Sequence, residues 1–313
     1  LTKEGRHLNA GVLPVSLFAS GHTFFVSRMA HLMHTQPYMV HTTFQYGGAQ
    51  GKRHRLRESM VWEDLPEYYA GPKFLRYDAD LPYDLVYPKG GEVRPDGTQE
   101  LSNHMSVEQH FTLVNHQLVQ LRNAFALARE LGRILILPRL VCGLDRWWAP
   151  HKNVIPGSAA QLPLVDCPAD HVIDVERMGT PELFLRESSF MCNPRLPAAV
   201  RGGIVSVGLD PIGVADAGAA ELGAGLIASL AANGAKVLSI TSPLVDYRVL
   251  LRGAKRTEFE RAISSWGGLW CCNSPPGGRG PGHIWYDFLN DIVPHVDRHN
   301  RKWDAPWFPK MGP

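Results

Sequence analysis

The sequence predicts an α/β fold, and three features carry this prediction. Apolar residues recur every three or four positions over residues 107–131, which is the pattern of an amphipathic helix. A short, wholly apolar run at 134–137 precedes Pro138, as expected of a strand buried between helices. A helix-compatible segment at 217–233 again leads into an apolar strand at 236–240. Alternating helices and buried strands are typical of α/β layers.

The ends of these elements follow from their flanking residues. Ser106 is expected to cap the first helix, with Gln109 as its capping-box partner, and Gly132 to end it. Asp216 is the expected N-cap of the helix at 217–233. We also expect a strand within 38–44 and a helix at 257–265.

Composition restricts the class of protein. With 313 residues, 44% of them hydrophobic and 20% charged, the chain is long enough to bury a sizeable core. A net charge of +2 excludes the broad basic surface of nucleic-acid-binding proteins, so anion recognition is expected to be local. The most apolar tract, 217–235, is interrupted by Glu221 and does not predict a membrane span. Because the sequence begins at Leu1 without methionine, we expect that an N-terminal portion, with any anchor, precedes it.

Proline and glycine suggest where the chain divides. Residues 88–98, PKGGEVRPDGT, contain two prolines and three glycines and no regular spacing of apolar residues. This composition predicts a linker. We therefore predict a first unit at 1–88, a linker at 89–104 and a second, α/β unit at 105–313.

The five cysteines include no CxxC pair with zinc-finger spacing, so a structural zinc site is not expected. Cys142, Cys167 and Cys192 lie in loop-like sequence. One disulfide and buried free thiols are both compatible with this pattern.

A basic segment follows three glycines and is the first candidate binding site. Its four permanent charges suit a diphosphate if the segment is a flexible loop, because cations stabilise a departing nucleoside diphosphate. The alternatives are a solvated charge run and a nuclear-import signal. The four cations are Lys52, Arg53, Arg55 and Arg57.

Three further candidates carry metal or ligand chemistry. His41 ends the strand-like stretch and is a candidate metal ligand, although a lone histidine is more often a structural hydrogen-bonding residue. Asp78 and Asp80 form an Asp-x-Asp, which we set aside because no apolar strand of the usual kind is expected before it. A second ligand or acceptor site is expected just beyond the strand at 134–137, because α/β sheets bind ligands there. Its residues are Arg139, Asp145 and Arg146, and a structural Arg/Asp pair is the alternative.

Together these stretches resemble glycosyltransferase family 77 of plants and green algae, especially its extensin arabinosyltransferase branch. The matching stretches are 13–26 (LPVSLFASGHTFFV), 37–69, 110–146, 162–175, and the GLWCC and PGHIWYD motifs. Residues 110–140 also loosely resemble protein O-fucosyltransferases. The resemblance implies the C-terminal part of a GT-A nucleotide-sugar transferase domain followed by a Rossmann-like α/β domain.

The resemblance also implies a reaction. It is a retaining transfer of L-arabinofuranose from a UDP-sugar to arabinosylated hydroxyproline-rich glycoproteins, with Mn²⁺, on the lumenal side of the Golgi membrane. His41 then resembles the histidine that touches the metal, and Lys52 the lysine that touches the diphosphate. The family's Asp-x-Asp lies upstream of the LPVSLF-like segment, so this chain is expected to lack it. The alternative hypothesis is a non-catalytic glycan- or glycoprotein-binding module; no catalytic residue is predicted.

Overall fold

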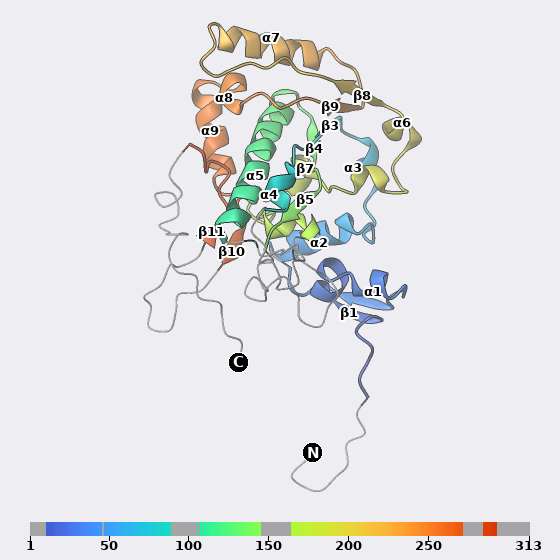
Figure 1. Cartoon of the computed structure of the whole chain (residues 1–313). Helices are drawn as coiled ribbons and strands as arrows, with labels where there is room; N and C mark the ends of the chain where they lie inside the picture. Colours follow the sequence, from blue (N-terminus) through green and yellow to red (C-terminus); the bar gives the residue numbers. More distant parts are fainter. Residues whose placement is uncertain are drawn as a thin grey trace.

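A five-stranded, all-parallel sheet forms the centre of the protein (Figure 1). The computed structural model describes residues 11–45, 47–88, 105, 107–144, 164–271 and 284–292. The strand order is β7-β4-β3-β9-β8. The strands are β3 (Phe74–Tyr77), β4 (Ile134–Ile136), β7 (Leu185–Arg186), β8 (Ile204–Val207) and β9 (Val237–Ile240). The predicted α/β class is confirmed.

Helices cover both faces of the sheet, which is how parallel sheets are normally buried. Alternate residues of a strand point to opposite faces, so Leu75 packs in the larger cluster with α5 while Phe74 packs in a smaller cluster with Tyr69 and Phe190. The helices after the N-terminal segment are α3 (Pro66–Ala70), α4 (Tyr83–Val86), α5 (Val107–Glu130), α6 (Ala198–Arg201), α7 (Ala219–Ala231), α8 (Tyr247–Leu250) and α9 (Gly253–Ile263).

Helix α5 confirms the longest periodic pattern of the sequence. Leu113, Val114 and Leu118 are completely buried against the sheet and α8. Gly132 has a φ of 59°, the left-handed conformation that ends a helix. The predicted cap, Ser106, lies outside the described residues.

The other predicted helices shift at their starts. Helix α7 begins after Gly218, which is its N-cap with a φ of 71°. The prediction that Asp216 caps this helix is wrong, because its carboxylate instead accepts a hydrogen bond from the backbone N–H of Gly213 over 2.6 Å. Helix α9 starts at Gly253, earlier than the predicted 257.

The central strand comes from the first third of the chain. β3 pairs with β4 on one side and with β9 on the other. The parallel sheet is therefore not confined to residues 105–313, although the division into two units stays a prediction. The linker at 89–104 lies outside the described residues.

Residues 11–58 form a layer beside this sheet, visible in blue in Figure 1. A two-stranded parallel pair contains His41 at its end, so the predicted strand in 38–44 is confirmed but shorter. The segment predicted as a flexible cationic loop is a helix. Gly47 and Gly48, with φ of 78° and 56°, turn the chain into it, and its Lys, Arg and Leu residues favour helix. The elements are β1 (Phe18–Ser20), a π-helix (His22–Val26), α1 (Met29–Leu32), β2 (Met39–His41) and α2 (Gly48–Glu58).

Two short antiparallel pairs complete the fold. They are β5 (Leu140–Cys142) with β6 (Leu164–Cys167), and β10 (Leu269–Cys271) with β11 (Ile284–Trp285). Across the described ranges, no helix has both the length and the apolar character needed to cross a membrane.

Candidate functional site

A pocket of about 370 Å³ lies beyond the carboxyl ends of β4 and β7, where α/β sheets commonly bind ligands. Segments that are far apart in sequence form its walls. They are the π-helix and α1, the end of α2, the start of β5, the end of β6 and the residues after β7. The lining residues include Phe24, Phe25, Arg28, His31, Arg55, Glu58, Ser59, Met60, Arg139, Leu140, Asp166, Pro168, Ser188, Ser189 and Cys192.

Two arginines share one carboxylate in this lining. Nη1 of Arg28 donates to Oδ2 of Asp166 over 2.7 Å, and Nε of Arg139 lies 3.6 Å from Oδ1 of the same group. Arg139 keeps 74% of its side chain exposed and Arg28 keeps 51%, so most of their donors remain accessible. Arg139, predicted to belong to a second ligand site beyond the strand, lines this pocket, and its role in binding stays a prediction. Asp145 and Arg146 lie outside the described residues.

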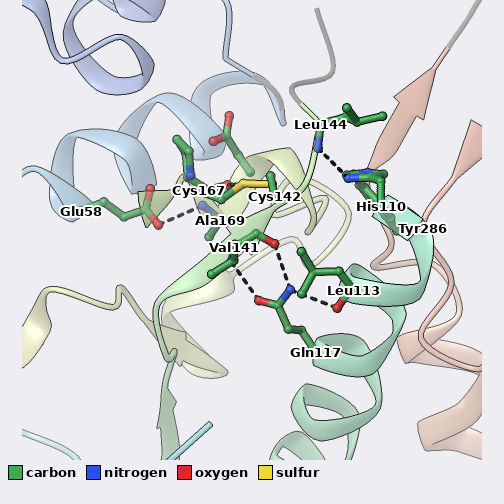
Figure 2. Close-up of a disulfide and its surroundings, with 12 residues drawn as sticks. Glu58, His110, Leu113, Gln117, Val141, Cys142, Leu144, Cys167, Ala169 and Tyr286 are labelled. Carbon is green, nitrogen blue, oxygen red and sulfur yellow. Dashed lines mark hydrogen bonds between the residues drawn. A yellow bond between two sulfur atoms is a disulfide. The ribbon is translucent and has the colours of Figure 1, made fainter. Parts of the chain in front are cut away.

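Glu58, the last residue of α2, places a second carboxylate in the pocket. Its Oε1 accepts the backbone N–H of Ala169 over 2.9 Å (Figure 2). The same oxygen lies 3.6 Å from Nε2 of His54. Burial alone would lower the pKa of His54, but the neighbouring carboxylates of Glu58, Glu187 and Asp170 raise it. These carboxylates favour the charged form of His54, and that form attracts the carboxylate of Glu58.

The wall formed by β5 and β6 is fixed from two directions, as Figure 2 shows. A disulfide joins Cys142 to Cys167, which decides between the two states that the sequence left open. On the other side, the amide of Gln117 in α5 donates to the carbonyl of Val141 over 2.9 Å and accepts its N–H over 2.8 Å. Both restraints act on the strand that begins at Leu140, next to Arg139.

The four cations of the basic segment occupy different environments. Arg55 pairs with Asp170, and both side chains are completely buried. Arg57 donates to Asp64 over 2.8 Å and to Glu182 over 2.8 Å. The charges of these two arginines are therefore already balanced by carboxylates of the protein.

The other two cations lie closer to solvent. Lys52 is exposed on α2. Arg53 lies 3.7 Å from Glu182 and above the ring of Trp62. If α2 contacts a diphosphate, Lys52 and Arg53 are its available donors, and the role of all four residues stays a prediction.

His41 lies at the exposed end of β2 and does not line the pocket. Manganese binds mainly to oxygen ligands, with imidazole as an addition, so a manganese site at His41 would need carboxylates beside the ring. Among the described residues, the group with metal-ligand spacing is Cys142, Cys167 and His171, whose sulfurs form the disulfide. The described residues thus do not fit a complete manganese site around His41.

The reason for setting aside Asp78 and Asp80 as a metal motif was wrong, and neither residue lines the pocket. They directly follow β3, the central strand, whose Phe74 and Leu75 are fully buried. Gln120 of α5 accepts the backbone N–H of Asp80 and donates to its carbonyl, each over 2.8 Å. These contacts tie the turn to the helix and leave both carboxylates exposed.

Sequence reasoning missed Arg28, Glu58 and Asp166 as pocket residues. The pair of Arg28 and Asp166 joins positions that are 138 residues apart in sequence, and no local pattern signals such a contact. Glu58 ends the basic segment and shares the face of α2 that contains His54, a spacing of four residues that the helical structure makes meaningful.

The fold is a parallel α/β sheet with a pocket beyond its carboxyl edge, the place where proteins of the α/β class commonly bind ligands. Comparison with curated proteins narrows this class: the chain is 36% identical, over 92% of its own length, to arabinosyltransferase XEG113 of Arabidopsis thaliana. The chain is therefore similar to an arabinosyltransferase over most of its own length, and the resemblance expected from its sequence is confirmed at that level.

The match has a defined extent. The aligned region covers 46% of the length of that relative, so the chain spans about half of it. No protein-family model matches the chain, and no solved structure matches it. Membership of glycosyltransferase family 77 stays a prediction.

Proposed function

We propose that the protein containing this chain is a retaining arabinosyltransferase. It transfers L-arabinofuranose from a UDP-sugar to arabinosylated hydroxyproline-rich glycoproteins. The observation that carries the proposal is the 36% identity to an arabinosyltransferase, which extends over 92% of the chain. The polar pocket beyond the sheet edge is consistent with a carbohydrate-active protein.

The donor side of this proposal rests on His41 and α2. We assign Lys52 and Arg53 to the diphosphate, because Arg55 and Arg57 are buried in ion pairs, whereas Lys52 is exposed and Arg53 keeps 42% of its side chain exposed at 3.7 Å from Glu182. Mn²⁺ is the proposed metal, with His41 as one proposed ligand. A lumenal Golgi location is also proposed, and the disulfide Cys142–Cys167 supports an oxidising compartment.

Turnover of UDP-arabinofuranose by the full-length enzyme tests this function. We expect His41→Ala and Lys52→Ala each to lower kcat/KM by about tenfold or more, because each removes a charge-stabilising contact. Lys73→Ala, which also removes an exposed lysine, is the matched control and should retain the wild-type rate. Absence of turnover by the wild-type enzyme would overturn the function, and wild-type rates in both variants would overturn the residue roles.

The buried ion pairs of Arg55 with Asp170 and of Arg57 with Glu182 favour a second candidate function. This candidate is a non-catalytic module that binds glycan or glycoprotein. Two of the four proposed donor cations are then structural. Calorimetry separates the candidates: Mn²⁺-dependent binding of UDP to this chain supports a donor site, whereas binding of arabinosylated peptide alone supports the module.

A further inference from the structure

We propose that the pocket between the 24–31 segment, the end of α2 and the β5–β6 pair binds the uncharged glycan of the acceptor. This inference rests on the proposed function and assigns one substrate to one site. The donor's diphosphate would bind elsewhere, toward Lys52 and His41, which do not line this pocket.

The charge balance of the lining favours an uncharged ligand. Two accessible cations, Arg28 and Arg139, share the carboxylate of Asp166, and Glu58, whose Oε1 lies 3.6 Å from Nε2 of His54, adds a second carboxylate to the lining. The third cation of the lining, Arg55, is balanced by Asp170 behind the pocket wall. A diphosphate would be repelled by both carboxylates, whereas a sugar hydroxyl can donate to a carboxylate and accept from a guanidinium.

The remaining lining residues suit a carbohydrate as well. Phe24 and Phe25 lie edge to face, with ring centroids 5.0 Å apart, and contribute apolar surface. Ser188 and Ser189, directly after β7, add hydroxyl groups. A surface that combines apolar area with a few fixed polar groups is usual for a small-ligand site.

The polar groups of the pocket are held before any ligand arrives. The disulfide and Gln117 fix the strand next to Arg139, and Ala169 and His54 hold Glu58. Preorganised groups lose little conformational entropy on binding, which strengthens recognition of a weakly bound neutral ligand.

Calorimetry on this chain with an arabinofuranose oligosaccharide and, separately, UDP tests the assignment. Asp166→Asn removes the charge that holds Arg28 and Arg139 and preserves the side-chain volume. We expect it, and Arg139→Ala, to weaken oligosaccharide binding about tenfold or more while leaving UDP binding unchanged. Both residues are substantially exposed, so the variants should fold, which circular dichroism will verify. Arg129→Ala, which removes a surface arginine paired with Glu258, is the matched control.

The opposite results are equally specific. If the pocket held the diphosphate, Asp166→Asn would tighten UDP binding, because it removes a repelling carboxylate. That outcome, an unchanged oligosaccharide affinity in both variants, or no oligosaccharide binding by the wild-type chain would each overturn the inference. Failure of the proposed function looks different: the full-length enzyme would not turn over UDP-arabinofuranose even if the oligosaccharide bound in the pocket.

Discussion

Arg55 of α2 donates from its Nε to Oδ1 of Asp170 over 3.0 Å, and neither side chain is exposed to solvent. The pair joins the basic helix to the segment after β6, 115 residues later in the chain. It is part of the structure that holds the N-terminal layer against the rest of the protein. Two of the four cations of the basic segment, Arg55 and Arg57, therefore form ion pairs inside the protein.

Removing one member of this pair should strongly destabilise the fold. Arg55→Ala leaves the Asp170 carboxylate buried without its cation, and we expect the free energy of unfolding to fall by about 3–5 kcal/mol. Urea denaturation followed by circular dichroism measures the change. Lys52→Ala, an exposed cation of the same helix, should shift the free energy by less than about 0.5 kcal/mol. If the two variants unfold alike, the pair is not structural.

The disulfide should contribute stability through the loop that it closes. Cys142 and Cys167 are 25 residues apart, and chain-entropy arguments for a loop of this length give about 3.5 kcal/mol. We expect the double variant Cys142→Ala/Cys167→Ala to unfold at lower denaturant concentration, and reducing agent to affect only the wild type. Cys192→Ala provides the control, because Cys192 is a free thiol. Peptide mapping that recovers Cys142 and Cys167 as free thiols from the oxidised protein would contradict the pairing.

His110 should make the protein sensitive to acid. The backbone N–H of Leu144 donates to its Nδ1 over 2.9 Å, so the ring proton lies on Nε2, which faces the hydroxyl of Tyr286 at 2.8 Å. Burial lowers the pKa of His110 to about 3. In the unfolded chain His110 takes up a proton near pH 6.5, so above that pH the neutral ring contributes its full share to the free energy of unfolding. This contribution is lost toward pH 3, at up to about 1.4 kcal/mol per pH unit.

The variant His110→Gln tests this pH dependence. Unfolding free energies of wild type and variant, measured between pH 7 and pH 4, should converge as the pH falls, because the variant has no ring to protonate. The difference between the two curves isolates His110 from the carboxylates and from His22. Curves that stay parallel over this range would show that His110 does not titrate as described.

Two glycines of α7 should respond in opposite ways to alanine. A Cβ on Gly223 would lie 2.5 Å from the backbone oxygen of Val249, where α7 packs on α8. A Cβ on Gly225 would meet nothing within 4 Å. We expect Gly223→Ala to destabilise the protein by about 1–3 kcal/mol and Gly225→Ala to stabilise it by about 0.5–1 kcal/mol. Thermal unfolding of the pair measures both, and equal shifts would contradict the packing of these helices.

The sequence by itself determined the elements whose signal is local. The apolar repeat in α5, the left-handed glycine after it and the apolar runs of β4 and β9 all have a period or an end signal that the backbone imposes on neighbouring residues. The relationship to arabinosyltransferases was visible for the same reason, because the matching stretches are local in the sequence. The basic segment was misread as a loop because its glycines lie at the start of a helix, where they serve as the turn into it.

Tertiary structure alone decided which groups meet. It paired Arg55 with Asp170, joined Cys142 to Cys167 and brought Arg28 and Arg139 onto Asp166. It also showed that Phe74–Tyr77 is the central strand of the sheet, so Asp78 directly follows a buried strand, contrary to the expectation from the sequence. Such contacts join residues that are tens to more than a hundred positions apart, and their energy depends on burial and distance, which one residue's sequence neighbours do not specify. The sequence therefore determined the α/β class and the family resemblance, and the folded chain determined where a ligand can bind.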